Sequence, residues 1–301
     1  MVPEAIPLVK RKLEASSPLK YKGGPMLKCL LLLVLAQTVP TVDQIMKTAE
    51  ETLAGARDYT GKLMRQERFL DGMKNQLNFF KFKKPFSVYL RFIDPFEGRE
   101  VIFVRGWNDN ELKVHKGSFP DITVSLDPKG SRAMERSHHP ITQFGFENTL
   151  KMAAKNLNLA RKRGEGEIKV SDGGVVNGHP VWKIEARFPQ GGHFVTAKDD
   201  ETLWEISRRT GQDMYLLLYA NHQKNDYDEP DDVDEGDRIF IPRYYGGRTE
   251  FCVTKDQSIP VRVVIRDWSG RLYEQYDYTE VKLNVGLTSK DFDPDNKAYD
   301  F

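Results

Sequence analysis

The side chains best suited to chemistry in this chain are histidines and clustered carboxylates. His138 and His139 are adjacent and could supply metal ligands, but Pro140 follows them, and no carboxylate or cysteine stands at a spacing typical of a metal site. We therefore interpret the pair as part of a surface loop and predict no metal site. The remaining histidines are scattered near predicted turns and strand ends: His115, His179, His193 and His222.

Motifs of nucleophilic or phosphate chemistry are absent from the sequence. It contains no Gly-x-Ser-x-Gly, no glycine-rich phosphate loop and no His-Glu-x-x-His. Glu165 and Glu167 fall in a predicted turn and give no support for the paired carboxylates of glycoside hydrolysis. We predict no catalytic residue and no cofactor.

An acidic run between residues 226 and 237 is dense in carboxylates, which are suitable oxygen ligands for calcium. Its spacing misses the EF-hand loop, which needs glycine at its sixth position. Runs of like charge are most often solvated loops. We interpret this run as a solvated loop, with calcium binding as the alternative.

The elements on either side of this run form a short module. The β-branched run 194–196 predicts a strand, and Thr202 with Glu205 forms a capping box that opens a helix. Asp213 can cap a second helix. A second strand over 238–241 completes a strand–helix–helix–strand unit.

This unit resembles the LysM domain, which binds the N-acetylglucosamine-containing glycans of peptidoglycan and chitin. The resemblance rests on Thr202–Ser207, Leu218–Asn221 and Gly236–Pro242. The usual Gly-Asp before the first helix is here Asp200-Glu201, and the loop after the second helix is long and acidic. In LysM domains these two loops form the glycan groove. The resemblance implies peptidoglycan or another N-acetylglucosamine glycan as a partner, with these contact residues: Asp200, Glu201, Thr202, Leu203, Asn221 and Tyr227.

Composition limits the class of partner. The 301 residues include 45 Lys and Arg against 44 Asp and Glu, so the net charge of +1 points neither to nucleic acid nor to an anionic membrane surface. There are two cysteines, Cys29 and Cys252. Because Cys29 lies in a predicted targeting segment, the mature chain would hold one thiol and no internal disulfide.

Residues 1–40 have the features of a targeting segment. Lys28 precedes the apolar run Cys29–Ala36, which is too short to span a bilayer. The small residues Val34 and Ala36 suit a signal-peptidase cut after Ala36. We expect export to the periplasm or cell envelope, with an uncleaved anchor or a buried segment as the alternative.

The rest of the chain alternates between helical and strand patterns. Apolar residues at helical spacing predict a helix over 42–53, opened by a capping box of Thr41 and Gln44, and a second helix over 142–163. The run 86–92 alternates between apolar and other residues, which is typical of a half-buried antiparallel strand. The predicted fold class is α+β, a curved antiparallel sheet with packed helices.

Strands of this sheet occur on both sides of the LysM-like unit. Asn177-Gly178 is a hairpin signal shortly before the unit, and alternating strands resume after residue 250. We therefore predict that residues 193–245 are inserted at a hairpin, where both ends of an insertion can lie close together. Residues 41–192 and 246–301 would then form one half-barrel.

Segments of this half-barrel resemble known proteins. Residues 58–63, 82–90 and 259–273 are similar to the LolA-type half-barrel, whose superfamily contains periplasmic carriers of lipoprotein acyl chains or other lipids. More closely, the chain from about 42 to 301 resembles the uncharacterised bacterial family called domain of unknown function 1571. The resemblance implies a lipid or lipoprotein acyl chain as a second partner.

An acyl chain needs an apolar lining that shields it from water. The predicted lining consists of aromatic and aliphatic strand residues: Phe82, Phe86, Val88, Leu90, Phe92, Trp182 and Ile184. For each of them the alternative is ordinary core, because apolar strand residues are mostly packed.

Three functions follow for this chain. The first is a non-enzymatic envelope protein whose half-barrel holds a lipid or acyl chain and whose insertion contacts cell-wall glycan. The second is a structural or protein-interaction role with a filled barrel. The third is a cell-wall hydrolase targeted by the LysM-like unit, which would require a cleft with two facing carboxylates. The first is the function that we predict.

Overall fold

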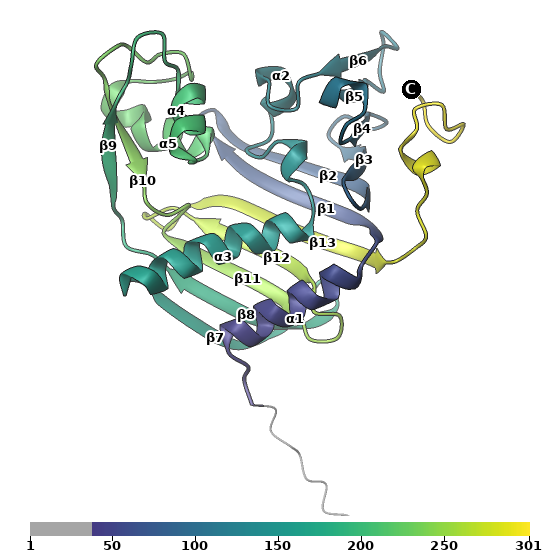
Figure 1. Ribbon diagram of the computed structural model, residues 1–301, viewed down its shortest axis with the longest axis horizontal. Coiled ribbons are helices and arrows are strands. Elements are labelled where there is room, and N and C mark those ends of the chain that lie inside the picture. The colour runs from purple at the N-terminus through teal and green to yellow at the C-terminus, as the bar shows by residue number, and fades with distance from the viewer. Residues whose placement is uncertain (1–37) are drawn as a thin grey trace, which may run out of the picture. The chain divides into compact units, whose positions relative to one another are not determined.

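An open antiparallel sheet of eleven strands is the frame of the protein (Figure 1). The computed structural model describes residues 38–301, so residues 1–37 of the predicted targeting segment lie outside the described residues. The strand order is β6-β5-β4-β3-β2-β1-β13-β12-β11-β8-β7, which leaves β6 and β7 as the edges. The strands are β1 (Asp58–Phe69), β2 (Gly72–Lys83), β3 (Ser87–Asp94), β4 (Glu100–Val104), β5 (Leu112–His115), β6 (Thr123–Leu126), β7 (Glu167–Val176), β8 (His179–Arg187), β9 (Gly192–Thr196), β10 (Arg238–Pro242), β11 (Arg248–Thr254), β12 (Pro260–Arg266) and β13 (Leu272–Leu283).

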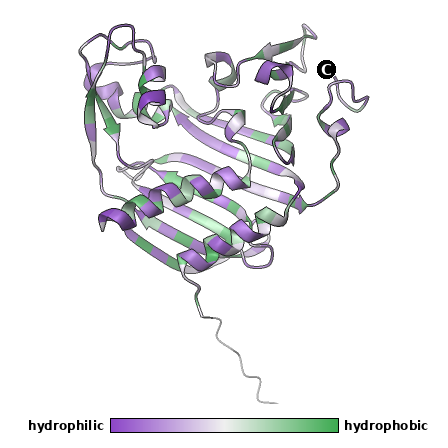
Figure 2. Ribbon diagram, in the orientation of Figure 1, coloured by the Kyte–Doolittle hydropathy of each residue, from purple (hydrophilic) through white to green (hydrophobic). Residues whose placement is uncertain are grey.

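Alternating side chains give this sheet two different faces. On β2, Phe80 and Phe82 are 0% and 3% exposed, whereas the intervening Lys81 points to the opposite side. Figure 2 shows hydrophobic and hydrophilic residues following one another along the strands. We call the face that carries Phe80 and Phe82 the inner face, and the opposite side the outer face.

Two long helices, α1 and α3, lie across the inner face (Figure 1). The capping box predicted at Thr41 and Gln44 is confirmed, because each side chain bonds to the backbone of the other. No helix within residues 38–301 has the length and apolar character needed to cross a bilayer. The helices are α1 (Val42–Gly55), α2 (Ser131–Met134), α3 (Phe146–Arg163), α4 (Leu203–Thr210) and α5 (Met214–Asn225), with short 3-10 helices η1 (Asn108–Asn110), η2 (Ile141–Gln143) and η3 (Ser289–Phe292).

Helix α3 begins at Phe146 instead of the predicted residue 142. Gly145 precedes it with a φ of 107°, a backbone conformation that glycine adopts more readily than other residues. The hydroxyl of Tyr59, on β1, accepts a hydrogen bond from the Phe146 amide at 3.0 Å. A side chain from the sheet therefore satisfies one of the free amides at the start of the helix and fixes where the helix begins.

The C-terminal residues cover part of the outer face. Phe292, in η3, is 4% exposed and packs against Tyr89 of β3. The Tyr299 ring stacks on Tyr89 with centroids 4.3 Å apart, and Lys81 donates to the Tyr299 hydroxyl at 2.9 Å. The outer face of β2 and β3 is thus occupied by the end of the same chain.

Residues 192–242, which we call the insert, form a separate two-stranded sheet with two helices. Strands β9 and β10 pair with each other, and α4 and α5 lie between them in the sequence. The flanking strands β8 and β11 are direct neighbours in the large sheet, with Ile184 opposite Phe251. The chain therefore leaves the large sheet and returns to it between two adjacent strands.

Gly145 provides a test of how the cover is joined to the sheet. A Cβ atom at this position would lie 2.8 Å from the Tyr59 hydroxyl oxygen and 3.1 Å from the Phe82 ring, in addition to the unfavourable φ. We expect Gly145→Ala to lower the free energy of unfolding by roughly 1–3 kcal/mol or more. Urea unfolding followed by circular dichroism measures this.

Gly55→Ala is the matched control, because a Cβ atom at Gly55 meets nothing within 4 Å. This control should leave the free energy of unfolding nearly unchanged. Equal stability of Gly145→Ala and Gly55→Ala would contradict the role given to Gly145.

Candidate functional site

The predicted lipid-lining residues lie on the inner face in two separate groups. One group lies on β2, β3 and the turn that joins them, and the other lies on β8. Four strands, β1, β13, β12 and β11, separate the two groups in the sheet. Six of the residues are buried, and Trp182 is half-buried. The first group contains Phe82, Phe86, Val88, Leu90 and Phe92, and the second contains Trp182 and Ile184.

Residues outside the predicted set complete the inner face between these groups. Tyr59 on β1, Tyr278 on β13, Val263 on β12 and Phe251 on β11 belong to the same apolar cluster. Each of them alternates with more polar neighbours along its strand, so the signal was present in the sequence. The sequence does not contain the strand order. The strand order is what brings the seven predicted residues and these four residues onto one surface.

The inner face is packed against its cover near the start of α3. The Tyr59 ring stacks on Phe82 with centroids 4.7 Å apart and also lies 4.7 Å from the Phe146 ring. Phe86 meets Phe82 edge to face at 5.5 Å. These rings fill the space between β1, β2 and α3.

Polar contacts hold the cover at its two ends. Near the start of α3, the Lys84 ammonium pairs with Glu147 at 3.0 Å and donates to the Leu53 carbonyl at the end of α1. At the opposite end, Arg161 of α3 pairs with Asp43 of α1 at 2.5 Å. The second contact joins one helix to the other instead of joining a helix to the sheet.

Three of the predicted glycan-binding residues are buried inside the insert. Leu203 and Asn221 are 0% exposed and Tyr227 is 2% exposed. The Asn221 side chain donates to the carbonyls of Leu217 and Phe240 at 2.8 and 2.9 Å and accepts from the Phe240 amide at 2.7 Å. It therefore joins α5 to β10. The resemblance to LysM domains implied that these side chains lie at a glycan groove, whereas the structure buries them within the insert.

The other three predicted glycan-binding residues lie in the loop before α4. Asp200 is exposed and has a left-handed φ of 54°. Thr202 caps α4 and forms the predicted capping box with Glu205. Glu201 pairs with Arg209 at 2.7 Å. This loop is the part of the predicted glycan site that remains near the surface.

The adjacent histidines are not a surface loop, so that interpretation of the sequence was wrong. His138 is 0% exposed, and the His139 side chain is 17% exposed. They follow α2 in a segment that is tied to β1 and to the insert. Arg65 of β1 donates to the Ser137 hydroxyl at 2.7 Å, and the Tyr215 hydroxyl of α5 donates to the Met134 carbonyl at 2.8 Å.

Two carboxylates lie beside these histidines. Glu67 on β1 and Glu274 on β13 stand directly opposite each other across the two strands and are 2% and 0% exposed. The Glu274 Oε1 atom lies 2.6 Å from His138 Nδ1 and 3.5 Å from His139 Nε2. His138 and Glu274 are 136 positions apart in the sequence, which is why spacing rules did not pair them.

Tyrosines complete the group. The Tyr245 hydroxyl donates to Glu274 Oε1, and the Tyr276 hydroxyl donates to Glu67 Oε1 at 2.6 Å. The buried His138 ring is enclosed by aromatic rings, with centroids at 4.6 to 5.1 Å, from Phe69, Tyr215 and Tyr273. We call Glu67, His138, His139, Tyr245, Glu274 and Tyr276 the acid–histidine cluster.

The cluster strongly shifts the ionisation of its members. Burial alone would lower the pKa of both histidines, but the Glu274 carboxylate outweighs burial, so the pKa of His138 is raised and that of His139 is raised to about 9. Burial likewise opposes ionisation of Glu274, yet the two histidines hold the pKa of its carboxyl well below the usual range. Burial raises the pKa of Tyr245 and Tyr276 well above 10.0, so both hydroxyls keep their protons.

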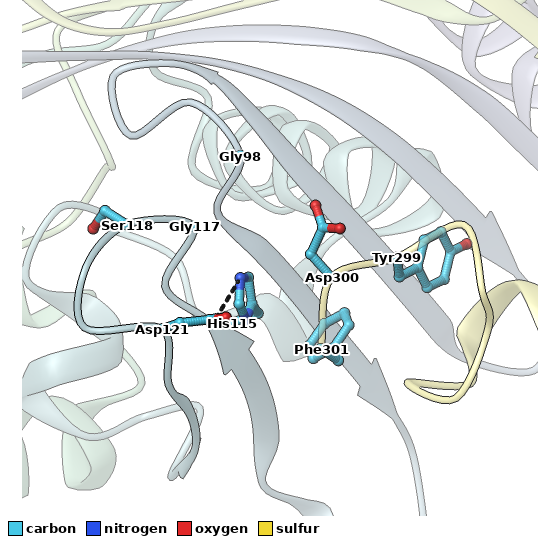
Figure 3. Close-up of a pocket in the computed structure, with 8 residues that line it drawn as sticks. All are labelled: Gly98, His115, Gly117, Ser118, Asp121, Tyr299, Asp300 and Phe301. Carbon is cyan, nitrogen blue, oxygen red and sulfur yellow. Dashed lines mark ion pairs between the residues drawn. The ribbon is translucent and has the colours of Figure 1, made fainter.

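An open pocket of about 480 Å³ lies beside the C-terminus (Figure 3). His115 and Asp121 form an ion pair at 3.5 Å on one side of it, and Phe301 lies on the other side. The Asp121 side chain is 87% exposed, whereas the His115 side chain is 6% exposed. None of the predicted site residues lines the pocket, which is bounded by loops and by the C-terminal residues instead of the inner face.

The chain was compared with known proteins. The family model described as "Protein of unknown function (DUF1571)" matches residues 56–207 and 243–301, which flank most of the insert. No curated protein matches the chain.

Among solved structures, the lipoprotein LppX of Mycobacterium tuberculosis is 10% identical, with a TM-score of 0.36 over 82% of this chain and 99% of that chain. A LolA superfamily protein from Nitrosomonas europaea is 11% identical, with a TM-score of 0.31 over 84% and 98%. The MucA/MucB complex of Pseudomonas aeruginosa matches at 9% identity and a TM-score of 0.39 over 83% and 59%. These values describe distant likenesses.

The buried position of Asn221 predicts that it stabilises the insert. We expect Asn221→Ala to lower the free energy of unfolding by about 1–3 kcal/mol, because the Phe240 amide and two carbonyls lose their partner inside the protein. Asn225→Ala is the matched control, since Asn225 lies on the same helix and makes one hydrogen bond of 3.4 Å at an exposed position. Thermal unfolding of both variants is the measurement. Equal melting temperatures would return Asn221 to the list of residues that can serve a ligand.

Proposed function

The chain belongs to the DUF1571 family of proteins of unknown function, and we propose that it is a non-enzymatic binding protein of the cell envelope. In this proposal the inner face holds a lipid or the acyl chain of a lipoprotein, and helices α1 and α3 form its cover. The insert contacts cell-wall glycan. The first of these roles has the stronger support, and it rests on the inner face and its cover.

The observation that carries the proposal is an opening between the two covering helices. An open pocket of about 430 Å³ lies where α1 begins and α3 ends. Its lining includes the apolar side chains of Val42, Ala160 and Ile168, and Val42 and Ala160 belong to the same apolar cluster as the inner face. A ligand that enters here meets apolar surface continuous with the sheet.

The middle of α3 covers the sheet with small side chains. Ala153 and Ala154 pack against the apolar cluster and are still half-buried instead of buried. Larger residues, Leu150 and Leu157, anchor the helix on either side of them and are 2% and 5% exposed. Because the side chains at the centre of α3 are small, the helix would need to move only slightly away from the sheet to admit an acyl chain beneath it.

The contacts that an acyl chain would replace are apolar, so contacts between the chain and the inner face can take their place. Burial of apolar surface is non-directional, and its free energy scales with the area removed from water. Polar contacts of the cover lie at its ends, at Lys84 and at Arg161, and also near the middle of α3, where Asn156 Oδ1 accepts a hydrogen bond from the Tyr245 amide at 3.4 Å. A ligand chain can therefore replace the contacts of α3 with the inner face while the ends of the helix stay attached.

Two further features agree with a binding role. Cys252 is 3% exposed, and burial raises the pKa of its thiol to about 11, so it is a poor nucleophile. The apolar run before residue 38 has the features of an export signal, which suits a protein that works in the envelope.

Glycan contact by the insert is the less supported half of the proposal. Of the residues predicted for it, Asp200, Glu201 and Thr202 remain near the surface, in the loop before α4. Any glycan would have to be recognised there, because the Asn221 and Tyr227 side chains are engaged in the core.

The competing function is a protein-interaction role with a filled barrel. The close packing of Tyr59, Phe82 and Phe146 favours it, because those rings leave no room beneath the start of α3. The two functions differ in whether the purified protein carries lipid. Solvent extraction of the full chain, followed by mass spectrometry of the extract, separates them: a stoichiometric lipid supports the carrier, and a lipid-free extract supports the filled barrel.

A substitution on the face of α3 that covers the sheet tests the same proposal through the affinity of the protein for a fatty acid. We expect Ala154→Trp to weaken binding of a fluorescent fatty acid by about tenfold or more, equivalent to ~1.4 kcal/mol, because the indole occupies the space beneath α3. Probe titration followed by fluorescence is the measurement.

Lys151→Trp is the matched control, because Lys151 is exposed on the same helix. It should bind the probe as the unchanged protein does. Equal loss in both variants, or no loss in either, would remove the inner face from consideration as the ligand site.

A further inference from the structure

We propose that the acid–histidine cluster binds one divalent metal ion of the first transition row, with Glu67, His138 and Glu274 as its protein ligands. One ring nitrogen of His138 and one carboxylate oxygen of each glutamate lie within 4.8 Å of one another. Ligand atoms in a tetrahedral site with bonds of about 2.1 Å are roughly 3.4 Å apart. This value lies between the 2.6 Å contact of His138 Nδ1 with Glu274 Oε1 and the 4.8 Å limit of the group, so small shifts of the side chains bring all three onto one ion.

Charge is the first argument for an ion at this position. Like charges directly opposite each other on neighbouring strands are destabilising, and burial makes the repulsion stronger. Glu67 and Glu274 are such a pair, and no lysine or arginine within residues 38–301 forms an ion pair with either of them. A divalent cation bound between the two carboxylates would offset this repulsion.

Unpartnered atoms favour the metal ion. His138 Nε2 and Glu274 Oε2 are buried and have no hydrogen-bond partner among the described residues. Because His138 Nδ1 already contacts Glu274 Oε1 at 2.6 Å, Nε2 is the ring nitrogen left without a partner, and coordination would satisfy it. A buried carboxylate oxygen without a donor is likewise costly, and coordination would satisfy it.

The surroundings resemble those that hold metal ligands in place. Ligating carboxylates and histidines are usually oriented by hydrogen bonds from neighbouring residues. Tyr276 donates to Glu67, and Tyr245 donates to Glu274. His139 Nε2 lies 3.5 Å from Glu274 Oε1, and its side chain is 17% exposed, so it marks the side from which an ion can enter.

The ligand types indicate the class of ion. Imidazole suits zinc, iron, copper and nickel, and carboxylates suit manganese and magnesium, so one histidine with two glutamates favours Zn²⁺ or Mn²⁺. An ion held by β1, β13 and the segment after α2 would tie this segment to the sheet. Its role is therefore structural.

The test uses the full chain without affinity-tag histidines, stripped with EDTA and then dialysed against Zn²⁺ or Mn²⁺. We expect one ion per chain by inductively coupled plasma mass spectrometry. We also expect the melting temperature to rise by roughly 5–10 °C when the ion is about a hundredfold above its Kd. An intact protein that retains neither ion and shows no change in melting temperature overturns the proposal.

Glutamine variants of the two glutamates test whether these side chains bind the ion. Glu67→Gln and Glu274→Gln should bind the ion at least about 10–100-fold more weakly. In EDTA, Glu67→Gln should melt no lower than the unchanged protein, because it removes one of the two repelling carboxylates.

His179→Gln is the matched control, since His179 pairs with Asp256 at an exposed position. Full retention of the ion by both glutamine variants would show that it binds elsewhere and would overturn the assignment. If the variants fail to fold, the X-ray absorption spectrum of the loaded, unchanged protein decides between nitrogen and oxygen ligands and an all-water shell.

Discussion

Apolar burial between the inner face of the sheet and helices α1 and α3 is the interaction on which the rest of the structure depends. An open sheet of eleven strands exposes a large surface, and one of its faces carries aromatic and β-branched residues across most of its width. Such a face must be covered, by helices or by a ligand. The helices do so with their own apolar stripes, and polar contacts at Lys84, Asn156 and Arg161 set their position. The stability of the fold and the binding of a ligand would therefore depend on the same apolar surface.

The inner face changes character along the strands. Near α1 and α3, β1 and β13 present Tyr59 and Tyr278, which pack among phenylalanines. Towards the insert the same two strands present Glu67 and Glu274, which face His138. The segment after α2 covers this polar end, and it is held there by hydrogen bonds together with the packing of aromatic rings around His138. One pair of strands thus presents two kinds of surface, apolar at one end and polar at the other, and each follows from which residues alternate onto the inner face.

Local features of this fold could be predicted from the sequence, and long-range ones could not. The capping box at Thr41, the hairpin at Asn177-Gly178 and the strand pattern around Val88 depend on neighbours within a few residues. The His138–Glu274 contact joins positions that only the strand order brings together, so no spacing rule could have found it. The buried position of Asn221 could not be predicted for a related reason, because its polar side chain satisfies backbone groups of β10 that the sequence does not place beside it.

The pairing of β1 with β13 has a consequence for how the chain folds. Tyr59 lies opposite Leu283, so the middle of the sheet joins strands from near the two ends of the described residues. Until β13 has been synthesised, β1 has an unpaired edge, and β2 to β6 can form only a partial sheet. Contacts of such large sequence separation form slowly, and an unpaired apolar strand is prone to associate with other chains. A chaperone that shields the first six strands would therefore protect this protein most during the interval before its last strand appears.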